Sequence, residues 1–284
     1  MILVLVNERG YYQYGKFIKN NDLFEFRKIY KKDINSFFAK VANKLKINQF
    51  DEWSKNLDKY EKVIIFDSGY SKRLTKFLRK KNKKIIVWFW NTIARKQELI
   101  LKDKNVDYFY SFDKNDCQKY NLKFNTQFYF DKLPQSCNNH IEYDVFFVGL
   151  DKGRKECIST LIDVFQDKNI SYNIDIIDDG ANPYHYSYSE YVELESKARC
   201  LLDIVSHKDS QGLTLRPLEA ICMNKKIITN NIHIDEYNFY NPNNVFIIGK
   251  DNFENIYDFI NTPYQKINEA DLKYYSINKW VTRF

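Results

Sequence analysis

Short, almost continuously apolar runs recur along the chain, with amphipathic stretches between them. In the first half of the sequence these runs occupy residues 2–7, 62–68, 83–90, 106–112 and, more weakly, 126–130. Residues 34–46 and 71–81 lie between them and have the apolar spacing of surface helices. Strands that are apolar on both faces and alternate with helices are typical of a parallel sheet covered by helices. The first half therefore predicts one open α/β unit.

The same alternation restarts after the polar, proline-containing stretch 131–143, which we interpret as an interdomain linker. A second set of apolar runs occupies residues 143–149, 172–178, 200–206, 225–230 and 244–249. Helices are predicted at 154–167, 189–198, 214–223 and in the closing segment "EADLKYYSINKWVTRF". The second half therefore predicts another α/β unit of similar size.

Two such units fit a chain of 284 residues, which is long for one domain. We expect an α/β protein with two Rossmann-like domains whose parallel sheets face each other across a cleft. The N-terminal domain is predicted at 1–135 and the C-terminal domain at 143–265, and the closing helix at 266–284 is a candidate to pack back on the N-terminal domain. Because ligands of such sheets bind beyond the carboxyl ends of the strands, the chemistry is expected there.

Composition and cysteine usage narrow the class of protein. The hydrophobic fraction is 44%, which supports a buried core, and no apolar run approaches the roughly 20 residues that span a bilayer. The start, "MILVLVNERG", has no basic leader or small-residue cleavage site, so we interpret it as a strand. The cysteines are odd in number and form no CxxC pair, which favours neither a zinc site nor a disulfide framework and fits a reducing cytoplasm.

The chain is basic, with a net charge of +7, and lysines cluster in "SKRLTKFLRKKNKK" at 71–84. Such a cluster attracts anionic membrane surfaces or phosphate-rich partners, although the solvated face of a helix has the same pattern. No nucleic-acid-binding module is recognisable, so nucleic acid is not an expected partner. We expect a cytoplasmic protein with the capacity to attach peripherally to the inner face of the plasma membrane.

The stretch "SHKDSQGLTLRPLEAICMNKKIITNN", 206–231, has the most specific pattern. A small-residue turn containing Gly212 follows a strand and leads into a helix that begins near Thr214. Free N–H groups in the first turn of a helix bind phosphate, and the helix dipole adds to the attraction. Glu219 then lies one turn further along, within reach of a ribose diol. Ordinary capping by Thr214 or Ser210, with Glu219 complementing the dipole, explains the same residues equally well.

The segment "QGLTLRPLEAICMNKKIITNN" resembles the donor-binding segment of GT-B glycosyltransferases, especially the bacterial enzymes of lipopolysaccharide and capsule biosynthesis. The segment "YDVFFVGLDKGR" is similar to the usual opening of their second domain, and "YSINKWVTRF" is similar to their closing helix. The resemblance covers residues 143–284 and is weaker over 1–142, where "VWFWNTI" is similar. It implies the GT-B fold, a nucleotide-sugar co-substrate, and neither a metal nor another cofactor.

The resemblance also implies roles for residues of the second domain. In GT-B enzymes the glutamate of this helix binds the donor ribose, and Glu219 matches it. The turn that holds the diphosphate corresponds to Ser210, Gln211, Gly212, Leu213 and Thr214. The basic residues that stabilise the leaving diphosphate correspond to Lys152, Arg154 and Arg216. Gly149 and Gly153 allow close approach. Gln211 stands where retaining enzymes of the largest GT-B group carry another glutamate, so the stereochemistry stays open.

Two other features of the second domain are candidate donor contacts. His207 ends the strand before the phosphate turn and is placed to contact a phosphate or the sugar, while a structural histidine bonded to the backbone is an equal alternative. The segment 176–191 is rich in tyrosine, and Tyr186 is the candidate to flank the nucleobase or sugar. The acidic pair Asp178 and Asp179 is a weak signal for Mg²⁺, which needs near-octahedral oxygen ligation, so no metal is expected.

In the first domain, the segment 7–17 follows the first strand, and its glycines indicate a mobile segment at the cleft. An inverting transfer needs a base within hydrogen-bond reach of the acceptor hydroxyl. The candidate bases are Glu8, Asp67 and Asp113, each with helix capping or a solvated loop as the alternative. The candidate acceptor contacts, at the end of one strand, are Trp88, Trp90 and Asn91. Indole rings stack on sugars, although burial of one tryptophan in the core is equally expected.

These features favour a glycosyltransferase that moves a sugar from a nucleotide-sugar donor to a cell-surface glycan or lipid-linked glycan acceptor. The alternative from another class is a non-catalytic nucleotide- or sugar-binding protein with the same fold. A nucleotide-dependent dehydrogenase or epimerase needs a glycine fingerprint after a strand, and "VNERGYYQYG" contains no GxGxxG. The nucleobase, the sugar and the acceptor are left open by the sequence.

Overall fold

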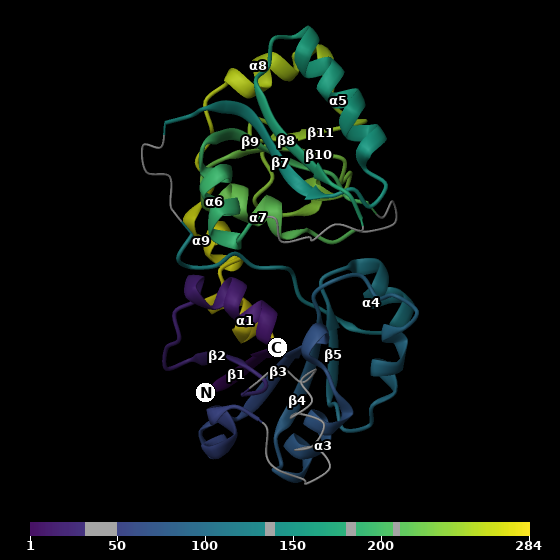
Figure 1. Ribbon diagram of the computed structural model, residues 1–284, viewed down its shortest axis with the longest axis vertical. Coiled ribbons are helices and arrows are strands. Elements are labelled where there is room, and N and C mark those ends of the chain that lie inside the picture. The colour runs from purple at the N-terminus through teal and green to yellow at the C-terminus, as the bar shows by residue number, and fades with distance from the viewer. Residues whose placement is uncertain (32–49, 134–139, 180–185, 207–210) are drawn as a thin grey trace. The chain divides into compact units, whose positions relative to one another are not determined.

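The computed structural model describes residues 1–31, 50–133, 140–179, 186–206 and 211–284 (Figure 1). They form two compact units. Unit 1 contains Met1–Thr126 together with Trp280–Phe284, and unit 2 contains Gln127–Lys279. The predicted helix at 34–46 lies outside the described residues. Within the residues that are described, no helix combines the length and the apolar character needed to cross a bilayer.

Unit 1 is built on a parallel sheet with the strand order β2-β1-β3-β4-β5-β6. Its strands are β1 (Ile2–Val6), β2 (Phe24–Lys28), β3 (Lys62–Phe66), β4 (Lys84–Phe89), β5 (Tyr108–Ser111) and β6 (Lys123–Phe124). Its α-helices are α1 (Glu8–Tyr14), α3 (Lys72–Lys80) and α4 (Lys114–Tyr120). Its short 3-10 helices are η1 (Gly15–Phe17), η2 (Glu52–Lys55), η3 (Leu57–Lys59), η4 (Asp67–Gly69), η5 (Gln97–Lys102) and η8 (Val281–Arg283).

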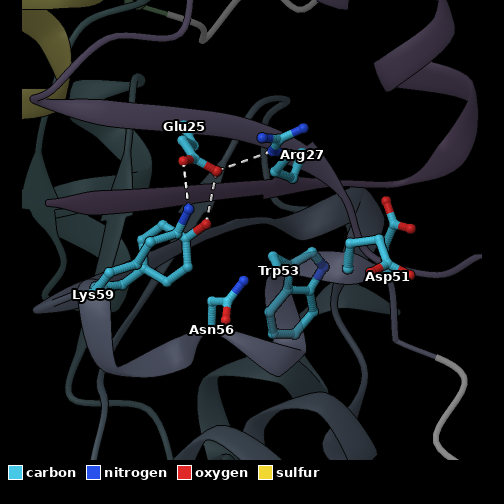
Figure 2. A pocket seen from close by; sticks show the side chains of 8 residues that line it. Glu25, Arg27, Asp51, Trp53, Asn56 and Lys59 are labelled. Carbon is cyan, nitrogen blue, oxygen red and sulfur yellow. Dashed lines mark hydrogen bonds and ion pairs between the residues drawn. The ribbon is translucent and has the colours of Figure 1, made fainter.

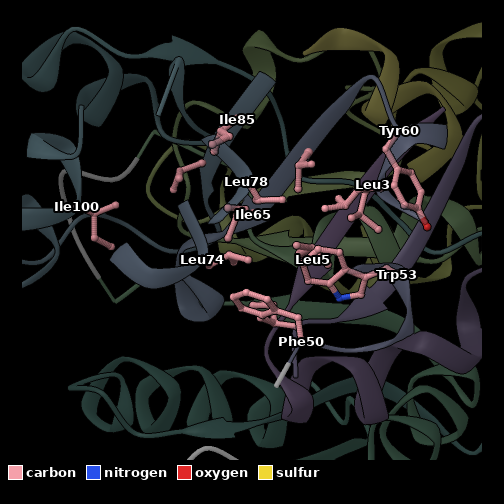
Figure 3. Close-up of a cluster of buried hydrophobic side chains, with 14 of the residues drawn as sticks. Leu3, Leu5, Phe50, Trp53, Tyr60, Ile65, Leu74, Leu78, Ile85 and Ile100 are labelled. Carbon is pink, nitrogen blue, oxygen red and sulfur yellow. The ribbon is translucent and has the colours of Figure 1, made fainter. Parts of the chain in front are cut away.

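One face of this sheet is covered by α3 and by the segment that follows residue 50. The side chains that pack there include Leu3, Leu5, Phe50, Trp53, Ile65, Leu74, Leu78 and Ile85 (Figure 3). Helix α3 begins after Ser71, whose Oγ accepts a hydrogen bond from the Leu74 N–H at 3.3 Å. Its leucines point into this cluster, and each fully buried aliphatic side chain stabilises the fold by about 1.5–3 kcal/mol.

The opposite face of the same sheet is covered in part by the C-terminal residues. The Trp280 ring lies 4.8 Å from Trp88 and 5.8 Å from Phe66, measured between ring centres. The Lys62 Nζ donates to the backbone oxygen of Phe284 at 2.7 Å. Because successive strand residues point to opposite faces, Phe66 and Trp88 are directed away from the cluster around α3. Trp280–Phe284 are therefore an integral part of unit 1.

Unit 2 is built on a second parallel sheet, with the strand order β11-β10-β9-β7-β8. Its strands are β7 (Tyr143–Leu150), β8 (Tyr172–Ile177), β9 (Ala198–Asp203), β10 (Lys226–Thr229) and β11 (Val245–Ile247). Its helices are α5 (Lys155–Asp167), α6 (Tyr188–Ser196), α7 (Leu215–Cys222), η6 (Ile234–Glu236), η7 (Phe253–Asn255), α8 (Ile256–Asn261), α9 (Glu269–Tyr274) and α10 (Ile277–Trp280), the last of which ends in unit 1. Helices α5 and α8 cover one face of the sheet, and α6 and α7 cover the other (Figure 1).

The predicted strands are confirmed except for 126–130. In the described structure that segment forms no strand, and Tyr129 makes an isolated bridge to Ser276. Strand β2 is absent from the prediction, although Phe24 and Phe26 are buried and alternate with polar residues. This alternation is the signature of a half-buried edge strand, which a search for continuous apolar runs does not detect.

The segment 7–17 is helical, and the Asn7 Oδ1 caps α1 by accepting a hydrogen bond from the Gly10 N–H at 2.8 Å. One further expectation needs correction. The closing segment is not one helix but two, α9 and α10. The break occurs at Tyr275, whose carbonyl accepts a hydrogen bond from the Tyr129 N–H at 2.9 Å.

Candidate functional site

At the carboxyl end of the sheet in unit 2, two arginine side chains lie over one aromatic ring. The guanidinium carbons of Arg154 and Arg216 are 5.0 and 4.7 Å from the centre of the Phe147 ring. Arg154 is the N-cap residue of α5, and Arg216 is in the first turn of α7. These helices follow β7 and β9, which are neighbours in a parallel sheet, so their N-termini meet at the same edge.

Uncharged groups hold both guanidinium groups in place. Arg154 donates to the backbone oxygen of Ile204 at 3.1 Å. Arg216 donates to the backbone oxygen of Val148 at 2.8 Å and to the hydroxyl of Tyr191 at 2.9 Å. Burial, together with the nearby charge of Arg216, lowers the pKa of Arg154 to about 10. The two guanidinium groups are close enough for the charge of one to act on the other, and guanidinium groups are preferred partners of phosphate oxygens.

The N-terminus of α7 adds to this positive region. Its N-cap residue is Thr214, but the Thr214 hydroxyl donates to the Asp203 Oδ1 at 2.7 Å and makes no capping bond to the helix. The first turn of α7 contains no acidic residue. Among the described residues, Thr214 therefore gives the first-turn N–H groups no side-chain cap, and the Asp203 carboxyl group lies next to the N-cap residue.

The turn before α7 is tied to the rest of unit 2 through its backbone. The Asn231 Nδ2 donates to the Gly212 oxygen at 3.1 Å, and the Tyr237 hydroxyl donates to the Gln211 oxygen at 2.9 Å. The Leu213 side chain is buried, so any contact of this residue with a ligand is made by its backbone. Two of the predicted donor contacts, His207 and Ser210, lie outside the described residues.

The turn between β7 and α5 has an unusual backbone. Lys152 and Gly153 have φ angles of +46° and +76°, and the Lys152 N–H donates to the Asp179 Oδ1 at 2.9 Å. The Lys152 side chain is exposed. A Cβ at Gly149 would lie 3.0 Å from the Arg154 Nη2. The glycine thus leaves room for the guanidinium group.

Glu219 is buried one turn inside α7, with an exposure of 1%. Its carboxyl group accepts a hydrogen bond from the Tyr188 hydroxyl at 2.5 Å. Burial raises the pKa of Glu219 to about 7, although the bond from Tyr188 and the charge of Arg216 oppose the rise. Tyr186 is partly exposed just before α6. Tyr188 was missed in the sequence, where only the helical spacing of the tyrosines at 188 and 191 could have indicated a shared face.

Two of the three candidate bases in unit 1 are held in structural hydrogen bonds. Asp67 accepts from the Trp90 N–H at 3.0 Å and from the Gln97 Nε2 at 2.6 Å, and burial raises its pKa. Asp113 is the N-cap of α4, where it accepts from the Asp116 N–H at 3.1 Å. Its exposure is 1%. Both carboxyl groups therefore act as local anchors of the backbone.

The third candidate, Glu8, is accessible to solvent. It lies in the first turn of α1, and its carboxylate is 3.7 Å from the Lys28 Nζ. The Lys28 ammonium also donates to the Tyr12 hydroxyl at 3.2 Å. Among the described residues of both units, no group of three or more His, Cys, Asp and Glu side chains is arranged to hold a metal ion.

The predicted acceptor contacts differ strongly in exposure. The Trp88 side chain is fully buried in the core, so it is not available to a ligand. Trp90 is partly exposed, and its ring stacks on Tyr14 with the centres 5.7 Å apart. Asn91 is exposed next to it. The carboxyl end of β4 thus presents an aromatic pair and an amide.

Comparison with known proteins identifies the architecture. No protein-family model matches the sequence, and no curated protein matches it. UDP-GlcNAc 2-epimerase from Methanocaldococcus jannaschii matches with 14% identity and a TM-score of 0.48 over 99% of this chain and 97% of that one. HepE from Anabaena, solved in complex with UDP and glucose, matches with 8% identity and a TM-score of 0.51 over 100% of this chain and 98% of that one. The fold is GT-B.

The fold class predicted from the sequence is confirmed, since this GT-B chain has two α/β units with parallel sheets. At these low identities the likeness extends to the GT-B architecture alone, and activity has to be argued from the site. Unit 2 of this GT-B chain carries the arginine pair, the N-terminus of α7 and the buried glutamate. Unit 1 carries the accessible Glu8 and the rim formed by Trp90.

A small hollow in unit 1 was not predicted by any sequence pattern. It lies beside β2 and has a volume of about 160 Å³ (Figure 2). The Glu25 carboxylate accepts hydrogen bonds from Lys59 at 2.6 Å, Tyr60 at 2.7 Å and Arg27 at 3.0 Å. Burial opposes its ionisation, but these bonds outweigh burial and lower the pKa of Glu25 to about 2. Because these charges are paired within the hollow, we assign the network to the stability of unit 1.

Proposed function

We propose that the protein is a glycosyltransferase that moves a sugar from a nucleotide-sugar donor to a cell-surface glycan, such as lipopolysaccharide or capsule, without a metal ion. The observation that carries the proposal is the pair of guanidinium groups over Phe147, beside the N-terminus of α7, where Thr214 makes no capping bond. Each charge-assisted hydrogen bond to a phosphate contributes about 1.5–3 kcal/mol. A diphosphate has enough oxygens to use several of these donors at once.

The remaining contacts of the proposed donor follow from the surroundings of the arginine pair. The ribose is assigned to Glu219, whose carboxyl group already accepts a hydroxyl hydrogen bond from Tyr188 at 2.5 Å. A ribose hydroxyl is the same kind of donor, and because Glu219 is only 1% exposed, we propose that it takes the place of the Tyr188 hydroxyl at this acceptor. The turn before α7 supplies backbone N–H groups, and the exposed Lys152 adds a mobile positive charge. Partly exposed Tyr186 offers a ring to the base or sugar.

The proposed reaction breaks the bond between the donor sugar and the diphosphate, and it leaves negative charge on the departing oxygen. Arg154, Arg216 and the dipole of α7 stabilise that charge, because they are fixed before the reaction begins. The acceptor hydroxyl loses its proton to a base, for which Glu8 is the accessible carboxylate among the three candidates. Trp90 and Asn91 are the proposed acceptor contacts, since a partly exposed indole stacks on a sugar ring.

A second candidate function is a non-catalytic protein that binds nucleotide sugars. The observation in its favour is that Asp67 and Asp113 hold backbone N–H groups, which leaves Glu8 as the accessible carboxylate among the three proposed bases. Slow hydrolysis of a nucleotide sugar distinguishes the two functions. A transferase hydrolyses its own donor at a measurable rate in the absence of acceptor, whereas a binding protein holds the donor intact.

Peripheral attachment to the inner face of the membrane is proposed for α3. Its leucines are buried, while the side chains of Lys72, Lys76 and Lys80 are exposed on the same helix. Anionic lipids attract such a basic face, and a lysine near the surface contributes about 1 kcal/mol. A membrane-bound acceptor would be reached from this position without a spanning segment.

The test of the donor site is a thermal-shift screen with UDP, GDP, CDP and CMP. A ligand that binds only the folded state at 100 times its Kd stabilises that state by about 2.7 kcal/mol and raises Tm. We expect one nucleoside diphosphate to raise Tm more than CMP does. The expected shift is lost in Arg154→Gln and Arg216→Gln, and it is retained in the control Arg199→Gln, whose arginine pairs with Asp144 at 3.1 Å.

Two results would contradict the proposal. One is that none of the nucleotides shifts Tm of the wild-type protein. The other is that Arg154→Gln binds as tightly as Arg199→Gln. For the ribose contact, Glu219→Ala is expected to raise the KM for the donor while the protein stays folded, and unchanged kinetics would remove the assignment of Glu219.

A further inference from the structure

Helix α6 directs three polar side chains toward α7, and one of them has no role so far. Tyr188 donates to Glu219 at 2.5 Å, and Tyr191 accepts from the Arg216 Nε at 2.9 Å. Glu195 follows Tyr191 by one helical turn, so it lies on the same face of α6. The exposure of Glu195 is 0%. A fully buried carboxyl group beside a proposed ribose acceptor calls for an explanation.

The carboxyl group of Glu195 is buried next to that of Glu219. Among the described residues no N–H or O–H group donates to its oxygens, and the Glu219 carboxyl group lies within hydrogen-bond reach of it. An ionised carboxylate in such a position is strongly unfavourable. Burial and the nearby charge of Glu219 raise the pKa of Glu195 well above its usual value. Glu219 has the Tyr188 hydroxyl and the charge of Arg216, so it ionises more easily than Glu195.

We propose that Glu195 is a positioning residue of the nucleotide site: it holds a proton that it donates to Glu219 and so keeps Glu219 ionised and oriented as the acceptor for a ribose hydroxyl. The inference rests on the proposed function. Two adjacent buried carboxyl groups share one proton and titrate as a pair, because both cannot be charged together. Glu195 keeps this proton because Glu219 has the short bond from Tyr188 in addition to the charge of Arg216, and Glu219 uses its charge toward the ligand.

The residues that surround the Glu195–Glu219 pair do not change charge near pH 7, so the pair itself is the part of this cluster that does. The titratable and charged groups on the surrounding elements are Tyr143 on β7, Tyr188 and Tyr191 on α6, Asp203 on β9, and Arg216 on α7. Burial raises the pKa of Tyr143 to about 12 and that of Tyr191 well above 10, and the pKa of Arg216 is raised as well. None of these three residues changes charge between pH 6 and 8.

A dependence of nucleotide affinity on pH follows from this arrangement. The pKa of Glu219 is raised to about 7, so Glu219 changes from the protonated to the ionised form as pH rises through this value. The ionised form accepts a ribose hydroxyl. Affinity is therefore expected to rise as pH increases from 6 to 8 and to level off above the midpoint.

The test measures the affinity for UDP by calorimetry between pH 6 and 8.5. Glu195→Gln keeps an N–H donor for Glu219 and is expected to have the wild-type affinity and midpoint. Glu195→Leu removes the donor, so the midpoint is expected to rise by about one pH unit and the affinity at pH 7 to fall about five-fold. The control is Glu193→Leu, an exposed residue on the same helix, which leaves the profile unchanged. The phosphate of UDP titrates near pH 6 in every sample and cancels between variants.

Identical pH profiles for Glu195→Gln and Glu195→Leu overturn the inference. If Glu195→Leu does not fold, Glu195→Gln alone decides, since a more than three-fold change in affinity at pH 7.5 shows that Glu195 is not a neutral donor. Carboxyl carbon NMR of the ligand-free wild-type protein provides an independent readout. A glutamate titrating near pH 7 supports the inference even if UDP does not bind, and the absence of any such glutamate overturns it. Failure of the nucleotide site and failure of the carboxyl pair are thus separate results.

Discussion

Gly149→Ala tests the arginine pair without changing any group that is proposed to touch the ligand. An alanine at this position would place its Cβ 3.0 Å from the Arg154 Nη2 and 3.4 Å from the Phe147 Cζ. The optimum for contact between heavy atoms is about 3.5–4.0 Å, so something has to move by about half an ångström. The Phe147 ring is fully buried, whereas the guanidinium is the end of a flexible side chain. The guanidinium of Arg154 is therefore the group that shifts.

The size of the effect follows from the bonds that this shift disturbs. The Arg154 Nη2, which the new Cβ approaches, donates to the Leu150 oxygen, and the Arg154 Nη1 donates to the Ile204 oxygen at 3.1 Å. A displacement of half an ångström brings the Ile204 bond to the limit of hydrogen bonding at about 3.5 Å. That bond is worth about 1 kcal/mol to stability. A guanidinium–phosphate bond is worth about 1.5–3 kcal/mol, and losing half of it costs about 1 kcal/mol of binding. We expect Kd for the nucleoside diphosphate to rise about five-fold, with only a small loss of stability.

The assay is calorimetric titration with the nucleotide that gives the largest thermal shift, together with Tm of each variant. The control is Gly249→Ala, because Gly249 has a φ of +90° and a Cβ there would meet nothing within 4 Å. It follows β11, three positions from β7 in the sheet order. Alanine in this conformation costs about 1 kcal/mol of stability and should leave Kd unchanged. Wild-type affinity in Gly149→Ala, or an equal loss in Gly249→Ala, refutes the reasoning.

Other variants probe the rest of the molecule. Tyr60→Phe removes a hydrogen-bond donor to Glu25. The pKa of Glu25 is lowered to about 2 in the folded protein, so the ionised Glu25 contributes its full stabilisation above its unfolded pKa of about 4.3, and this contribution is lost as pH falls toward 2. The Tm gap to the wild type should therefore close between pH 5 and pH 2, and a constant gap would contradict this role. Arg216→Lys keeps the charge but loses the planar guanidinium group that bonds the Val148 carbonyl and the Tyr191 hydroxyl, so the Kd for the nucleoside diphosphate, measured by calorimetry, should rise about ten-fold. An unchanged Kd would show that Arg216 is not part of the site. Lys76→Glu with Lys80→Glu should weaken co-sedimentation with anionic vesicles by more than about ten-fold, and the wild-type binding should fall as salt rises. Equal sedimentation of both proteins would exclude α3 as the contact.

The course of the chain through two parallel sheets could be read from sequence because strands of this kind are buried on both faces. Their apolar runs are nearly continuous, so β3 and β4 stand out without any knowledge of their neighbours. Strand β2 lies at the edge, where only Phe24 and Phe26 need burial, and its signal is correspondingly weak. The run at 126–130 is apolar for another reason, since Phe128 and Phe130 are buried without forming a strand.

The residues of the candidate site also fall into two groups: those that the sequence could place and those that only the structure could place. Local sequence placed Arg154 after β7 and Arg216 and Glu219 on α7, because each follows a strand at a fixed short distance. It could not show that Asp67 and Asp113 are used to hold backbone N–H groups, since a carboxylate after a strand has the same appearance in either role.

By itself, the sequence determined the order of the strands that are buried on both faces, the division of the chain into two α/β halves, and the residues that follow the ends of these strands. Only the tertiary structure decided that the guanidinium groups of Arg154 and Arg216 lie over the Phe147 ring and that Glu195 is fully buried next to Glu219. The physical reason is that periodicity and turn chemistry act over a few neighbouring residues. Burial and charge pairing depend on how α6 and α7 pack on the sheet, and residues more than 20 positions apart meet there.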